Sequence, residues 1–78
     1  MEQQEMILKL LLDVGETMLL HGSEVKRVED TLYRMGMAYG AKKMDVFAIN
    51  SNIVLTMTMG EDKVYTRTRR LVATAETN

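Results

Sequence analysis

The chain has 78 residues, a formal net charge of −1 at pH 7, and neither cysteine nor proline. A chain of this length forms one small domain, and the missing cysteines exclude disulfides and thiolate metal sites. The near-zero charge argues against nucleic acid as a partner. We therefore expect no metal and no cofactor, since the only histidine, His21, has no cluster of acidic residues around it.

Residues 4–21 are predicted to form the first helix. Its apolar residues fall on two adjacent stripes, Ile7, Leu11, Val14 and Met18 beside Leu8, Leu12, Gly15 and Leu19. Such a wide apolar face predicts two packing partners, a second helix and a sheet, and Gly15 would let a neighbour approach closely. Three charged residues, Lys9, Asp13 and Glu16, interrupt this segment. It therefore falls short of the roughly 20 apolar residues that span a bilayer, and we expect a soluble domain without a targeting segment.

The stretch from Gly22 to Gly40 is predicted to form the second helix. Gly22 suits the left-handed end of the first helix, and Ser23 suits the N-cap of the next. Gly40 marks the end of this helix. The expected buried stripe consists of Val25, Val28, Leu32, Met35 and Tyr39. A two-residue connection forces the helices into an antiparallel hairpin.

After Gly40 the apolar period changes to two, which predicts strands over residues 44–49, 53–59 and 64–70. Turn residues separate them, first Asn50-Ser51-Asn52 and then residues 60–63. The predicted fold is α+β and two-layered. An antiparallel helical hairpin packs on one face of a three-stranded antiparallel sheet, in the order ααβββ.

The expected register, with Ser51 and Asn52 forming the first turn, assigns each strand residue to a face. The helices should cover the side that carries Met44, Val46, Ala48, Leu55, Met57 and Met59. The other side should mix apolar and basic groups, unlike a plain solvated face. We predict an interface there made of Phe47, Ile49, Val54, Tyr65, Arg67 and Arg69, with Tyr33 and Met37 of the second helix as another candidate contact. A thin sheet in a small domain also predicts self-association, so a homo-oligomer is expected.

Several runs of residues, in this order, resemble the soluble N-terminal domain of the threonine/serine exporter family. They are Gly22-Ser23-Glu24, Arg27-Val28-Glu29-Asp30-Thr31, Arg34, Gly40 and Thr66-Arg67-Thr68-Arg69-Arg70. The resemblance covers residues 7–72 and implies a cytoplasmic domain that precedes the membrane helices of an amino-acid or dicarboxylate exporter. Residues 1–78 would then be a single soluble domain, an N-terminal fragment of a longer transporter, at the cytoplasmic face of the membrane. Its partner would be the downstream transmembrane domain.

One part of the chain departs from the family. Its members usually place a proline-threonine-glycine-like turn where this chain has Asn50-Ser51-Asn52. Any role of that turn therefore does not carry over to this sequence.

Glu24, Arg27 and Glu29 match the most recognisable run of the family and form the candidate functional cluster. One interpretation is that they contact the transport domain or bind a ligand carboxylate. The alternative is a solvated helix face, on which Arg27 pairs weakly with Glu24 or Asp30 at a spacing of three.

The leading hypothesis is a non-catalytic accessory or regulatory domain of a small-metabolite exporter, for which a small molecule is a candidate ligand. A hydrolase-like domain that uses Ser23 as its nucleophile is the first alternative. A free-standing homo-oligomeric binding module is the second. His21 is predicted to have a structural role, because a positively charged side chain is favourable at the C-terminal end of a helix.

Overall fold

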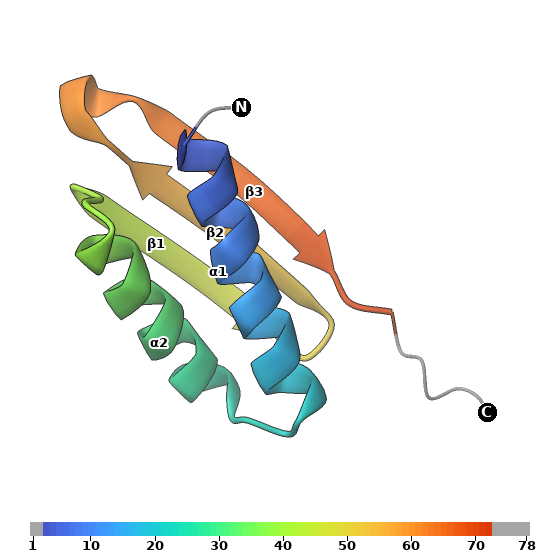
Figure 1. The fold of residues 1–78 in the computed structure, drawn as a ribbon. Helices are drawn as coiled ribbons and strands as arrows, with labels where there is room; N and C mark the ends of the chain where they lie inside the picture. The colour runs from blue at the N-terminus through green and yellow to red at the C-terminus, as the bar shows by residue number, and fades with distance from the viewer. Residues whose placement is uncertain (1–2, 73–78) are drawn as a thin grey trace.

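The computed structural model describes residues 3–72. Two helices, α1 (Gln3–Leu20) and α2 (Val25–Ala38), precede three strands, β1 (Lys43–Ile49), β2 (Asn52–Thr58) and β3 (Val64–Arg70). A short 3₁₀ turn, η1 (Gly60–Asp62), lies between β2 and β3. The strands form one antiparallel sheet in the order β1-β2-β3 (Figure 1). The predicted α+β order ααβββ is thereby confirmed.

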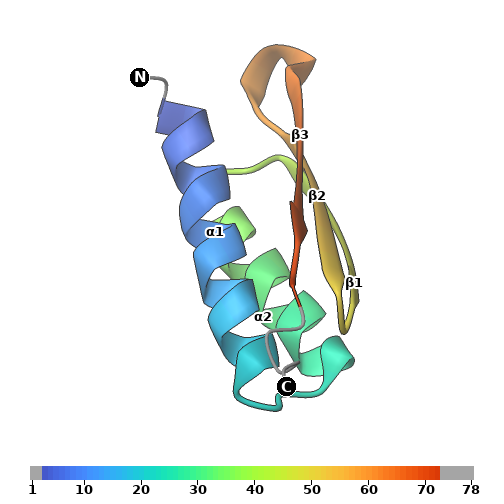
Figure 2. The ribbon, with the colours of Figure 1, turned by 90° about the vertical axis from the view of Figure 1, so that its right-hand side faces the viewer.

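Both helices lie on the same side of the sheet, and its other side is uncovered by any described element (Figure 2). In this hairpin α2 packs on β1, while α1 packs on α2, β2 and β3. The broad apolar face of α1 therefore has the two partners that its sequence predicted. Within residues 3–72 no helix has the length and apolar character needed to cross a membrane.

Glycines end both helices, as predicted. Gly22 has φ +89°, and the N–H groups of Gly22 and Ser23 donate to the carbonyls of Leu19 and Met18. Gly40 has φ +103°, and the N–H groups of Gly40 and Ala41 donate in the same way to Met37 and Gly36. Each pair of bonds satisfies carbonyls at the end of a helix, in the pattern called the Schellman motif.

The predicted N-cap of α2 was wrong by one residue. Glu24, not Ser23, takes the N-cap position, with φ −67° and ψ 145°, and its side chain makes no capping hydrogen bond. The backbone of Ser23 instead belongs to the end of α1, because its N–H donates to the Met18 carbonyl in the motif that ends that helix. The two-residue link is thus shared between the end of one helix and the start of the next.

The core lies between the helices and the inner face of the sheet. Its fully buried side chains are Leu8, Leu11, Leu12, Val28, Leu32, Ile53, Leu55 and Met57. Gly15 permits the close approach that was predicted, since a Cβ there would lie 2.8 Å from Ile53 Cδ1 and 2.9 Å from Leu32 Cδ1. The prediction that Tyr39 belongs to the buried stripe was wrong, because this side chain is 47% exposed. Gly36 is buried instead, beneath the side chain of Met44.

The β1–β2 turn consists of Asn50 and Ser51, so that Ile49 pairs with Asn52. The predicted turn was one residue further along the chain. That difference moves the pairing by two residues and leaves every side chain on its predicted face, because the side-chain period of a strand is two. Met44, Ala48, Ile53, Leu55 and Met57 accordingly point into the core.

The predicted face of β3 was wrong, and Tyr65, Arg67 and Arg69 lie on the helix side of the sheet. Thr58 pairs with Val64, so five residues connect the strands instead of the expected four. Met59 N–H donates to the Lys63 carbonyl at 2.8 Å, and Glu61 and Asp62 adopt positive φ values of 63° and 58°. The extra residue exchanges the two faces of β3. Its outward residues are therefore Val64, Thr66, Thr68 and Arg70.

Candidate functional site

A row of ionic contacts joins α1 to β3 along one edge of the molecule. The residues of α1 are Glu5, Lys9, Asp13 and Glu16, whose spacings of four, four and three place them on one side of the helix. The residues of β3 are Arg67 and Arg69, which face the helices. We call these six residues the charged seam.

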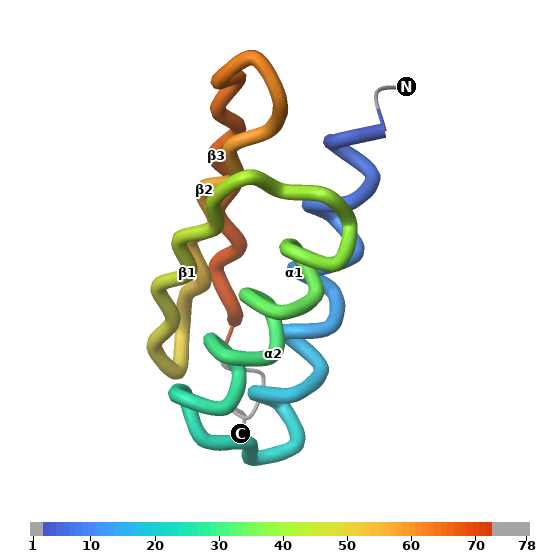
Figure 3. The backbone as a smooth tube through the Cα atoms, turned by 90° about the vertical axis from the view of Figure 1, so that its left-hand side faces the viewer, coloured from blue at the N-terminus to red at the C-terminus, as the bar shows by residue number. Residues whose placement is uncertain are grey.

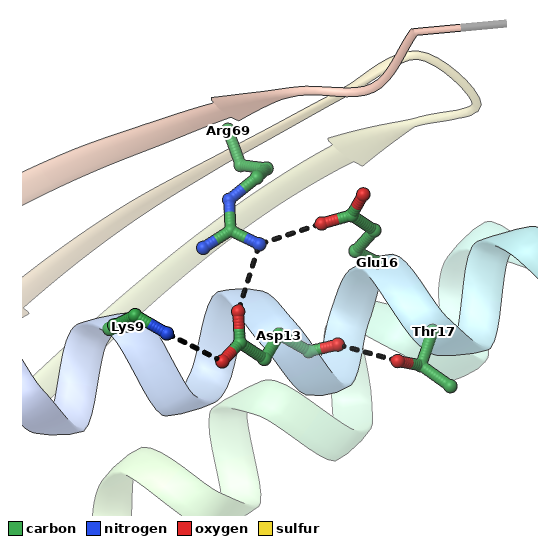
Figure 4. Close-up of polar contacts among 5 residues, drawn as sticks. All are labelled: Lys9, Asp13, Glu16, Thr17 and Arg69. Atoms are coloured by element: carbon green, nitrogen blue, oxygen red, sulfur yellow. Dashed lines mark hydrogen bonds and ion pairs between the residues drawn. The ribbon is translucent and has the colours of Figure 1, made fainter. Parts of the chain in front are cut away.

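Arg69 forms the most enclosed contact of the charged seam (Figure 4). Its Nη1 atom donates to Asp13 Oδ1 at 3.0 Å and to Glu16 Oε1 at 2.7 Å, and its side chain is 26% exposed. The hydrogen bond to Glu16 is the main reason that the pKa of Arg69 is raised above its usual value. The guanidinium is thus held in its charged form between two carboxylates.

Asp13 receives cations from two elements. Lys9 Nζ lies 3.1 Å from Asp13 Oδ2, while Arg69 reaches the other carboxylate oxygen. The pKa of Asp13 is lowered from 3.8, first by the hydrogen bond from Lys9 and then by that from Arg69. Thr17 Oγ1 donates to the backbone carbonyl of Asp13 at 2.9 Å, one turn further along the helix. Asp13 is therefore ionised at neutral pH and fixed in position.

The other end of the charged seam is more open. Arg67 Nη2 lies 3.5 Å from Glu5 Oε1, with side chains 46% and 49% exposed. A groove of about 560 Å³ lies here, lined by Glu5, Met6, Lys9 and Arg67. The N-terminal end of α1 diverges from β3 in both side views of the backbone (Figures 2 and 3). The charged seam is consequently closed at Arg69 and open at Arg67.

The predicted cluster of Glu24, Arg27 and Glu29 is not brought together as a site. Glu24 and Arg27 are exposed, and neither forms an ion pair within residues 3–72. Asp30, the expected neighbour of Arg27, pairs with Arg34 at 3.1 Å. Within residues 3–72, Glu24 and Arg27 therefore lie on an exposed face of α2.

Glu29 has a separate, structural contact. Its Oε2 atom accepts a hydrogen bond from the Ala48 N–H at 2.9 Å, across the gap between α2 and β1. β1 is an edge strand, and an unpaired N–H on such a strand invites pairing with another chain. Glu29 satisfies one of these groups and ties α2 to the edge of the sheet.

The predicted interface residues divide between two faces. Phe47, Ile49 and Val54 lie on the uncovered side of the sheet, where Phe47 is 59% and Ile49 is 45% exposed. Val64, which was not predicted, lies on the same side at the other end of the sheet, opposite Thr58, and is 60% exposed. We call Phe47, Ile49, Val54 and Val64 the open-face patch. Tyr33 and Met37 are exposed on α2, as expected.

The side chains of His21 and Ser23 make no hydrogen bond to each other. His21 Nδ1 donates to the Thr17 carbonyl at 2.8 Å, in the last turn of α1. Ser23 makes no side-chain hydrogen bond to any residue that the structure describes. In that same part of the chain, no three His, Asp or Glu side chains are grouped so as to hold a metal ion. The chemistry that the site offers is the binding of charged groups.

Sequence reasoning missed Glu5, Lys9, Asp13 and Glu16 as partners of the β3 arginines. A signal was present, since one helix flank carries carboxylates while alternate residues of β3 carry Arg67 and Arg69. This pairing can be predicted only when Arg67 and Arg69 are assigned to the helix side of the sheet. That assignment depends on the length of the β2–β3 turn.

Comparison with known proteins identifies a family. A family model described as "Putative threonine/serine exporter" matches residues 9–78. No curated protein and no solved structure matches the chain. The match covers α1 from residue 9 onward, all of α2, the whole sheet and the Arg69 end of the charged seam, and it leaves out Glu5 and Met6.

Proposed function

The chain belongs to the threonine/serine exporter family, and from this premise we propose that it is an accessory or regulatory domain of a small-metabolite exporter. The proposed cargo is an amino acid of the threonine or serine type, or a dicarboxylate. The observation that carries the proposal is the family match from residue 9 to residue 78. We further propose that a downstream transmembrane domain of the same protein moves the cargo.

The open-face patch supports docking of this domain onto the transport domain. The sheet has helices on one side only, and Phe47, Ile49 and Val64 are exposed on the other. A three-stranded face with seven-residue strands measures roughly 23 by 14 Å from ordinary strand spacings. A stable complex between separate proteins buries about 800 Å² on each partner. A tethered domain needs less contact, because a linker gives it a high effective concentration.

The proposed location is the cytoplasmic face of the membrane. The chain has no cysteine, so a single one introduced at exposed Glu61 provides a specific label in a protein otherwise freed of cysteines. A membrane-impermeant maleimide should label Glu61→Cys in lysed cells and leave it unlabelled in intact cells. Labelling in intact cells would contradict the cytoplasmic location.

Export itself is tested with the full-length protein. Cells loaded with threonine or serine should release it faster when the full-length protein is produced. Deletion of residues 1–78, with membrane insertion verified, should lower or deregulate that release. Unchanged kinetics and unchanged dependence on internal amino acid would contradict an accessory or regulatory role.

A further inference from the structure

The open end of the charged seam has the features of a small-molecule site. Its groove, of about 560 Å³, falls within the roughly 300–1,000 Å³ that is typical of ligand pockets. Both of its walls are formed by regular elements, α1 on one side and β3 on the other. Such elements hold their side chains in more fixed positions than loops do.

The charged groups of this groove have unused binding capacity. The 3.5 Å separation of Arg67 Nη2 and Glu5 Oε1 is longer than the roughly 2.7–3.2 Å of a good N–H···O bond. Neither side chain makes a hydrogen bond to any residue among 3–72. Lys9 contacts Asp13, yet its ammonium has three donors. A ligand placed between Arg67 and Glu5 would therefore gain two contacts in exchange for one loose pair.

We propose that this groove binds the zwitterion of a free α-amino acid. The guanidinium of Arg67 on the β3 wall presents a planar fork that matches a carboxylate, and Lys9 adds a second cation from the α1 wall. The Glu5 carboxylate accepts from the ligand ammonium. Met6, 58% exposed, offers an adaptable apolar surface to the ligand side chain.

The closed end of the same seam shows why the site is at Arg67 and not at Arg69. Arg69 already has two carboxylate partners at 3.0 and 2.7 Å and is largely covered. A ligand carboxylate there would have to displace Asp13 or Glu16. The two arginines thus differ in availability, although they point to the same side of one strand.

The choice of a hydroxy amino acid as the ligand rests on the proposed function, whereas zwitterion binding rests on the groove alone. A domain that binds the cargo of its own transporter could report the internal concentration of that cargo. The proposal concerns this regulatory site and not the route of transport.

The test is a titration of the isotope-labelled 78-residue chain with L-threonine, followed by NMR. Amide signals of Glu5, Met6, Lys9 and Arg67 should shift together and saturate. The matched probes are 2-amino-1,3-butanediol, which lacks the carboxylate, and 3-hydroxybutyrate, which lacks the ammonium. Each should bind about tenfold more weakly or worse, as loss of one charge-assisted contact predicts. Equal shifts with all three probes, or none with threonine, would overturn the proposal.

Variants locate the site. Arg67→Gln and Glu5→Gln should each weaken threonine binding about tenfold, and Arg67→Lys should have an intermediate effect because it retains charge without the planar fork. Arg34→Gln removes an exposed arginine on α2 and should leave binding unchanged. Circular dichroism verifies that each variant is folded. Unchanged binding in both folded groove variants would refute this location.

The two proposals fail separately. If the chain binds no amino acid but its deletion still alters export, the groove proposal is wrong and the accessory function stands. If threonine binds but deletion changes nothing in export, the groove proposal stands and the accessory function is wrong.

Discussion

The guanidinium of Arg69 lies between Asp13 and Glu16, with its Nη1 atom 3.0 Å from the first carboxylate and 2.7 Å from the second. This contact joins the last strand to the first helix, across more than 50 residues of sequence. Apolar packing holds the other edge of the sheet, where α2 covers β1 through Val28, Leu32 and Met44. Ion pairs thus link α1 to β3, whereas α2 is held to β1 by apolar packing and by the hydrogen bond from Ala48 N–H to Glu29.

Replacement of Arg69 should destabilise the domain more than replacement of an exposed arginine. Arg69→Gln leaves two carboxylates without their shared cation and should cost about 1–2 kcal/mol, allowing for partial exposure. Arg34→Gln breaks a solvated pair on α2, with side chains 76% and 58% exposed, and should cost about 0.5 kcal/mol or less. Urea titrations of both variants provide the comparison. Equal costs would show that the Arg69 contact adds no more than a surface pair.

Acid should remove the contribution of Asp13 to stability. The folded-state pKa of this carboxyl is lowered from 3.8 by Lys9 and Arg69, so the folded state binds its proton less readily than the unfolded state does. The contribution is present above pH 3.8 and is lost as the pH falls through the folded-state pKa. The free-energy difference between wild type and Asp13→Asn should be constant above about pH 5 and should shrink below pH 4. A difference that is independent of pH would contradict this assignment.

Truncation at two positions of α2 should distinguish its buried side from its exposed side. Leu32 is fully buried, so Leu32→Ala should cost about 2–5 kcal/mol in free energy of unfolding. Met37, 38% exposed, serves as the control, and Met37→Ala should have little effect. Chemical denaturation measures both. Similar losses would mean that the helix is rotated relative to the structure described.

The start of α2 offers a stabilising substitution. Glu24 takes the N-cap position without a side-chain hydrogen bond, and its long side chain is a poor cap. Glu24→Asp keeps the charge at the helix N-terminus and supplies a favoured capping side chain, so it should stabilise the domain by about 0.5–1 kcal/mol. Ser23→Ala should be nearly neutral, because Ser23 is not the cap. Thermal melts of both variants test this, and a destabilising Ser23→Ala would restore the original N-cap prediction.

The hydrolase alternative predicts a different behaviour for Ser23. We expect an ester and phosphate hydrolysis screen of the chain to give no turnover that depends on this hydroxyl, because the side chains of Ser23 and His21 make no hydrogen bond to each other. Activity that disappears in folded Ser23→Ala would establish the alternative.

The sequence predicted the elements well because each has local signals. Gly22 and Gly40 marked both helix ends, and the alternation from Ile53 to Met57 marked the inner face of β2. The face of β3 was not predictable in the same way, because it depends on whether four or five residues form a turn. That turn uses positive φ at Glu61 and Asp62, a conformation that is uncommon outside glycine, although aspartate adopts it more readily than glutamate. One residue there decided whether Arg67 and Arg69 faced solvent or α1, and so decided the candidate site.

The residues on the uncovered face of the sheet predict how strongly the chain associates with itself. The open-face patch contains Phe47, Ile49, Val54 and Val64, bordered by threonines and by Arg70, while Arg67 and Arg69 lie on the other side of the sheet. Its small footprint supports only a weak dimer, so the 78-residue chain should be monomeric at micromolar concentration and should associate as the concentration approaches the millimolar range.

Phe47→Asp places a charge in the contact and should keep the chain monomeric throughout. Tyr33→Asp makes the same kind of change on α2 and should leave association unaltered. Light scattering across the concentration series measures all three proteins. Association that ignores Phe47→Asp and responds to Tyr33→Asp would transfer the contact to α2, and a wild-type chain that stays monomeric would leave the patch to the transport domain alone.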